Sequence, residues 1–195
     1  MLAVTTELYA YWNGLRGARA APERNDIDPG AIRGVLPDTF VLDFDERGGF
    51  PFRIAGSRAN ALFLRELRGV SFLDLWRDAD RADLSAILHC VAGEIRPVLI
   101  GAKGGPAGAE PVDIEVILLP LRHHGLVRAR VLGALAANAT PDWMGLIEAG
   151  PLSVATHEPL GSAAENPGQQ AGFSLHNAPR RYKHLFVYSR DAQAS

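Results

Sequence analysis

Residues 52–69 read FRIAGSRANALFLRELRG, and the interpretation of the fold starts from this stretch. Its first residues have the composition of a β-strand, and Gly56 interrupts that pattern. The residues that follow predict a short helix that ends at Gly69, because glycine is common just after a helix. A phosphate-binding loop would need closely spaced glycines or a Gly-Lys-Ser/Thr ending, so both glycines are interpreted as structural.

The segments before Gly56 predict an antiparallel hairpin. Residues 39–46, TFVLDFDE, and residues 49–56, GFPFRIAG, are rich in aromatic and branched apolar side chains. Residues 46–49, ERGG, have the composition of a turn between two such strands.

Two helices are predicted nearer the N-terminus. In residues 5–16, one apolar stripe is formed at helical spacing by Leu8, Tyr11, Trp12 and Leu15. A second, short helix is expected to begin at Asp28 and Pro29 and to end before Pro37.

One helix and three strands are predicted after the opening stretch. Residues 78–95 form the helix, and residues 96–103, 110–124 and 126–137 form the strands. The middle strand alternates at first and is then apolar on both faces, at Ile117, Leu119 and Leu121. Pro120 cannot donate a ladder hydrogen bond, so a bulge or an early strand end is expected there.

This order of elements predicts an α+β fold, with one five-stranded antiparallel sheet and helices packed on one face. We divide the chain into an N-terminal helical extension (1–37), a core domain (38–137) and a C-terminal tail (138–195) that is partly disordered. No internal repeat is present.

Composition limits the function classes. The 195 residues carry a net charge of −2, so charge does not favour nucleic acid or an anionic membrane as a partner. The single cysteine, Cys90, excludes an intramolecular disulfide and fits a reducing cytoplasm, where we expect the protein. We also expect no signal peptide and no membrane span.

Several separate segments over about residues 8–137 carry a resemblance to a known family. They are YWNGLRGARAAPERNDIDP (11–29), LPDTFVLD (36–43), FRIAGSR (52–58), ELRG (66–69), SFLDLW (71–76), ILLPL (117–121) and LGAL (132–135). The chain resembles the small PAS-like family common in alphaproteobacteria, long known only as a domain of unknown function. One departure is Leu64, where members often have glycine.

The resemblance implies a regulatory module and not an enzyme. PAS domains bind small molecules or partner proteins between the concave face of the sheet and the helices, and members of this family often lack an output domain. We therefore expect action through partner proteins, with or without a small ligand. The alternatives are a dedicated sensor with an essential ligand and, third, an enzyme, for which no convergent polar groups are evident.

A ligand pocket, if the core is not simply filled, is expected among the inward apolar side chains. The candidates are Phe40, Leu42, Phe52, Ile54, Phe63, Phe72, Trp76, Ile117, Leu119 and Leu132. We expect no bound metal, heme or flavin. His89 lies about 140° from Leu84 on the helical wheel, and Cys90 lacks the Asn-Cys-Arg-Phe context of flavin photoreceptors.

The charged residues around the pocket have two interpretations each. Arg65, Glu66 and Arg68 are read as solvated or locally paired, with functional contact as the alternative. Residues 15–29 are read as an extended linker held by Arg–Asp hydrogen bonds, with a partner surface as the alternative. The partner-surface candidates, which include a homodimer contact through the first helix, are Tyr11, Trp12, Arg16, Arg19 and Arg24.

Overall fold

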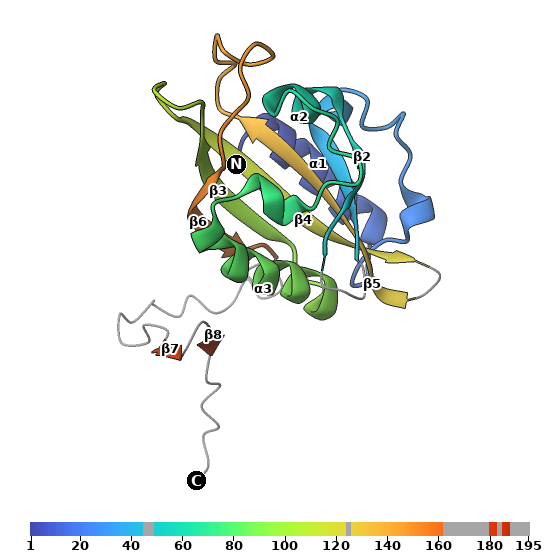
Figure 1. The fold of residues 1–195 in the computed structure, drawn as a ribbon. Helices are drawn as coiled ribbons and strands as arrows, with labels where there is room; N and C mark the ends of the chain where they lie inside the picture. The colour runs from blue at the N-terminus through green and yellow to red at the C-terminus, as the bar shows by residue number, and fades with distance from the viewer. Residues whose placement is uncertain (45–48, 124–125, 162–179, 183–184, 188–195) are drawn as a thin grey trace, which may run out of the picture. The chain divides into compact units, whose positions relative to one another are not determined.

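A computed structural model describes residues 1–44, 49–123, 126–161, 180–182 and 185–187. Residues 1–161 form one compact unit around a six-stranded antiparallel sheet (Figure 1), whose strands lie in the order β2-β1-β5-β4-β3-β6. The strands are β1 Thr39–Asp43, β2 Phe52–Ala55, β3 Val98–Gly104, β4 Val112–His123, β5 Leu126–Ala137 and β6 Ser153–Pro159. The α+β class, the hairpin of β1 with β2 and the strands β3 to β5 are confirmed.

Helices cover both faces of the sheet, not one as expected (Figure 1). The inner face carries α2 Ser57–Leu62, the 3-10 helix η3 Phe72–Leu75 and α3 Asp78–Glu94. The outer face carries α1 Ala3–Arg16, which contacts β4 and β5. The cause is the alternation along β4. Val116 and Leu118 face the inner core, whereas Ile117 and Leu119 face the outer core.

The prediction of a five-stranded sheet followed by an irregular tail is wrong for residues 153–159, which form β6 and pair with β3. β6 is an edge strand, and most of its side chains are exposed. Its sequence, SVATHEP, therefore lacks the apolar alternation by which a half-buried strand is identified.

The helix in the opening stretch is shorter than expected. α2 ends at Leu62, and the chain then turns at Leu64, whose φ is +48°. Two hydrogen bonds to Asn60 fix this turn, from the Arg65 nitrogen to the backbone oxygen and from the Leu67 nitrogen to Oδ1. The helix therefore ends at Leu62, seven residues before Gly69.

Residues 28–35 form successive turns, not the predicted short helix, and only the 3-10 helix η2 Leu36–Asp38 follows. The Asp28 side chain accepts a hydrogen bond from the Gly30 nitrogen, which favours a turn at that point. An early end of β4 at Pro120 is wrong, because Pro120 pairs with Val131 and β4 continues to His123. The bulge that was the other expectation has a counterpart close by, since the register with β5 is irregular between Leu121 and His123.

The second unit, residues 162–195, contains β7 Arg180–Tyr182 and β8 Leu185–Val187, which pair antiparallel. The turn expected at residues 46–49 lies outside the described residues except for Gly49.

Candidate functional site: a groove on the outer face

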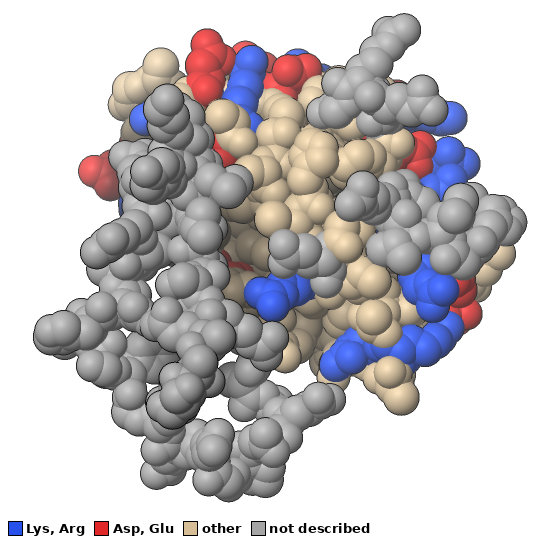
Figure 2. Space-filling model, turned by 90° about the horizontal axis from the view of Figure 1, so that it is seen from below, with Lys and Arg blue, Asp and Glu red and all other residues tan. Residues whose placement is uncertain are grey.

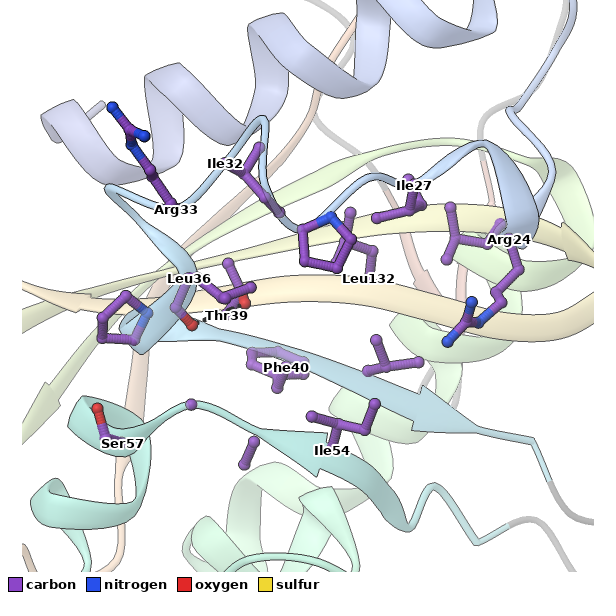
Figure 3. A pocket seen from close by; sticks show the side chains of 16 residues that line it. Arg24, Ile27, Ile32, Arg33, Leu36, Thr39, Phe40, Ile54, Ser57 and Leu132 are labelled. Carbon is purple, nitrogen blue, oxygen red and sulfur yellow. Dashed lines mark hydrogen bonds between the residues drawn. The ribbon is translucent and has the colours of Figure 1, made fainter.

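A half-open apolar cavity of about 510 Å³ lies on the outer face of the sheet, and we call it the outer groove (Figure 3). Residues 24–33 form one wall, and β1, the start of α2 and the end of β2 form the other. Its lining includes Arg24, Ile27, Ile32, Leu36, Thr39, Phe40, Val41, Ile54, Ser57 and Leu132. A cavity of this size is in the range of small-molecule sites.

The wall formed by residues 24–33 is held in place by charged side chains. Arg19 Nη2 lies 2.8 Å from Asp26 Oδ2, which also accepts a hydrogen bond of 3.0 Å from the Glu23 nitrogen. The hydrogen bond from Glu23, together with Arg19, lowers the pKa of Asp26. Glu23 in turn lies 3.5 Å from Arg122 Nε on β4. These contacts support the interpretation of this segment as a linker held over the sheet by Arg–Asp hydrogen bonds.

The end of the groove beside η2 and α2 is built on a close backbone contact. A Cβ atom on Gly56 would lie 2.3 Å from the Pro37 carbonyl oxygen, so only glycine fits there. Nearby, Arg58 Nη2 lies 2.8 Å from Asp38 Oδ2. Burial raises the pKa of Asp38, and the Arg58 guanidinium partly opposes that rise.

A second hollow, lined by several charged residues, adjoins the outer groove, and we call it the arginine basin. Arg24, Ile54 and Ala55 line both. The charged residues that line the basin are Arg24, Asp43, Arg53, Glu66 and Arg68. Among the described residues, Asp43 has ion pairs with both Arg53 and Arg130, at 3.3 and 2.9 Å.

The predicted pocket residues do not form one pocket. Phe40, Ile54 and Leu132 line the outer groove. Ile117 and Leu119 are buried in the outer core, under α1. The five others are buried in the inner core, namely Leu42, Phe52, Phe63, Phe72 and Trp76. Aromatic contacts fill that core, with ring centroids 5.3 to 5.9 Å apart between Phe40, Phe52, Phe72 and Trp76.

One of the five predicted partner-surface residues is not at the surface, and three others take part in contacts within the chain. Trp12 is buried, and its Nε1 donates to the Pro120 carbonyl at 2.9 Å, so its assignment to a partner surface is wrong. Tyr11 Oη accepts from the Asp28 nitrogen, and Arg16 and Arg19 bond carbonyl oxygens near the end of α1. Arg24 differs, because no described residue forms an ion pair or hydrogen bond with its side chain.

The solvent-exposed side of α3 carries few reactive side chains. His89 is exposed, as predicted from the helical wheel, and lies edge-on to Phe44 and Phe50. Cys90 is exposed as well. Seen from the α3 side, uncharged residues occupy the centre of the surface and charged residues surround it (Figure 2). Among the described residues, no group of three His, Cys, Asp or Glu side chains could hold a metal ion.

Sequence reasoning missed most of the groove wall, including Ile27, Ile32, Leu36 and Val41. A signal was present, because residues 27–36 carry the large apolar side chains of Ile27, Ile32, Val35 and Leu36. For the part of the chain that the structure describes, none of the helices has the length and apolar character needed to cross a membrane.

Comparison with known proteins places most of the chain in one family. A family model described as PAS domain matches residues 2–136. A solved structure titled "Structure of an RNA-binding Light-Oxygen-Voltage Receptor" is similar at 23% identity and a TM-score of 0.38, over 54% of this chain and 31% of that one. The chain spans about a third of that receptor, and so distant a likeness carries no argument about function. No curated protein matches.

Proposed function

The chain belongs to the PAS domain family, and from this premise we propose that it is a non-catalytic regulatory module that receives a small ligand in the outer groove and acts by binding partner proteins. The observation that carries the proposal is the groove itself, an apolar cavity with walls from two separate parts of the chain. We propose no enzymatic step and no bound heme or flavin.

The packing of the inner core supports a ligand site on the outer face. Phe40, Phe52, Phe72 and Trp76 are each at most 1% exposed and contact one another where a ligand would otherwise lie between the sheet and the helices. A ligand there would have to displace well-packed aromatic side chains. A ligand in the outer groove displaces none of them.

The groove also offers a way for ligand binding to reach a partner. One of its walls, residues 24–33, is continuous with the segment that follows α1. A ligand that contacts this wall and β1 together stabilises one position of the segment relative to the sheet. We propose that partner proteins distinguish the liganded from the free position of residues 19–37.

The proposal is tested by native mass spectrometry of the protein purified from its own host, with a visible absorbance spectrum recorded alongside. We expect a colourless protein that carries a stoichiometric small molecule. The variant Ile54→Trp, which fills the groove from a side chain that is 51% exposed, should lose that molecule. Ile147→Trp, at an exposed site outside the groove, is the matched control and should retain it. A ligand retained by Ile54→Trp would place the site elsewhere.

A second candidate function is an interaction module that needs no ligand. The observation that favours it is a group of exposed apolar side chains, since Leu146 and Ile147 are 76% and 53% exposed. Their loop is joined to the end of α2 by the hydrogen bond from the Ala149 nitrogen to the Leu62 oxygen. A protein that purifies without a ligand but with a partner chain, which Leu146→Glu releases, would favour this function over the first.

A further inference from the structure

We infer that the ligand of the outer groove is a small amphipathic anion, with its apolar body in the groove and its acid group at Arg24. This inference rests on the proposed function, because it names the chemical class of the ligand for the same site. It follows from the polarity of the groove, from the position of Arg24 and from the balance of charge around it.

The body of the groove selects an apolar group. Its walls are formed mainly by the aliphatic side chains of Ile27, Ile32, Leu36, Val41, Ile54 and Leu132. One of the two hydroxyl groups at its far end, Thr39 Oγ1, already has an internal partner, because it donates to the Leu36 oxygen at 2.9 Å. A hydrocarbon chain or ring therefore gains more from this cavity than a polar molecule of equal size does.

Arg24 stands where the groove opens into the arginine basin, since it lines both. Its guanidinium group points from the N-terminal wall toward the side of β1 and Ile54 (Figure 3). The acidic residues nearest to it in sequence are engaged elsewhere, Glu23 with Arg122 and Asp26 with Arg19. Arg24 is half-buried, and among the described residues no acid balances its charge.

The surrounding charges favour an anion as well. Among the described residues no acidic side chain lines the groove, and of its two arginines only Arg24 turns its guanidinium toward the cavity. In the basin, Arg24, Arg53 and Arg68 face Asp43 and Glu66, and Asp43 already pairs with Arg53 and Arg130. A carboxylate or a phosphate at the mouth would thus meet a net positive charge and the bidentate geometry that a guanidinium offers.

The test compares three probes by isothermal titration calorimetry with the ligand-free protein: octanoate, octanol and acetate. We expect octanoate to bind about tenfold more tightly than octanol, because a charge-assisted hydrogen bond is added. Acetate should show no measurable binding. Each added methylene group should tighten binding roughly fourfold, so decanoate, which is longer than octanoate, should bind more tightly than octanoate does.

Variants locate the acid group. Arg24→Gln should weaken octanoate binding about tenfold and leave octanol binding unchanged. Arg33→Gln is the matched control, because Arg33 lines the groove while its guanidinium points away from it, toward α1 (Figure 3). This control should bind octanoate as the parent protein does.

Each contrary result has a definite meaning. Equal affinity for octanoate and octanol, unchanged binding by Arg24→Gln, or no octanoate binding at all would overturn the inference. If the host-purified protein then carries a neutral molecule that Ile54→Trp loses, the proposed function stands and only the ligand class is wrong. If it carries no molecule, both fail.

Discussion

Leu64 adopts a backbone conformation that L-amino acids rarely occupy, with φ at +48°, and its side chain is 46% exposed. Members of the family that this sequence resembles often have glycine at this position, and the turn after α2 supplies the physical reason. Glycine has no Cβ and adopts positive φ without strain. At the residue scale, therefore, a departure from the family pattern marks a strained turn and not a change in the groove, which Leu64 does not line.

Leu64→Gly should raise the free energy of unfolding by about 0.5–1 kcal/mol, because relief of left-handed strain exceeds the added chain entropy. Urea unfolding followed by circular dichroism measures this change. Leu64→Ala keeps the strain and should give no gain. A glycine variant that is less stable than the alanine variant would contradict the assignment of strain to this turn.

The buried carboxyl of Asp38 predicts a pH dependence of stability. Burial raises its pKa above the ordinary value of 3.8, so the folded state favours the protonated form. The stability that Asp38 contributes is then fully present below pH 3.8 and is lost as the pH rises through the folded pKa. Asp38→Asn removes this titration, so its stability relative to the parent should increase as the pH rises above 3.8.

Urea unfolding of both proteins at several pH values measures that difference. Arg58→Gln provides an internal check, because it removes the charge that opposes the rise in the Asp38 pKa. With Asp38 present, stability should then fall more steeply as the pH rises. If the unfolding free energies of the parent and of Asp38→Asn change in parallel with pH, Asp38 does not titrate in this range.

At the scale of elements, the sequence predicted those whose side chains alternate or repeat against a core. The hairpin of β1 and β2, the strands β3 to β5 and the helices α1 and α3 all bury one face, so periodicity marks them. β6 was missed because it lies at an edge with its side chains exposed. The end of α2 was placed too late because Asn60 side-chain bonding and the angle at Leu64 are not visible in apolar spacing.

The start of α1 depends on a side chain from another element. Glu115 on β4 accepts hydrogen bonds from the Leu2 nitrogen at 2.6 Å and from the hydroxyl of Thr5, which is fully buried. A carboxylate in this position stabilises the positive end of the helix, and no local side chain caps it.

Glu115→Gln should lower the free energy of unfolding by about 1 kcal/mol, because it removes the charge from the helix end. It should also increase hydrogen exchange in residues 3–16. Asp113→Asn is the control on the same strand, where the ion pair with Lys103 is exposed and solvent-screened and is expected to contribute much less to stability. Equal losses for the two variants would remove the special role of Glu115.

At the scale of the whole molecule, the sheet is a shared wall between two cores, and the candidate site belongs to the outer one. The sequence indicated part of this result, since β4 carries apolar side chains at Ile117, Leu119 and Leu121 on the face opposite Val116 and Leu118. The element that covers the second face could not be predicted, because the apolar stripe of α1 fits a contact with a partner as well as a contact with the sheet. The predicted pocket therefore combined side chains from opposite faces of one sheet.

This arrangement changes what removal of α1 should do. Trp12 is 1% exposed, packs on the outer core and bonds the Pro120 oxygen, so α1 is part of the fold and not a free dimerisation arm. Trp12→Ala should cost about 3–5 kcal/mol of unfolding free energy, by loss of packing and of the buried hydrogen bond. Tyr11→Phe, at a partly buried position of the same helix, keeps the ring and should cost less than about 1.5 kcal/mol.

Deletion of residues 1–17 should uncover Leu99, Ile117 and Leu119 and yield an aggregating protein. Thermal unfolding and analytical size-exclusion chromatography measure both outcomes. A deletion variant that remains a stable monomer would show that the outer core does not need α1. The N-terminal wall of the groove, which follows α1 in the chain, would then be held in place by contacts that include the ion pairs of Glu23 and Asp26 and the hydrogen bond from the Arg122 nitrogen to the Pro22 oxygen.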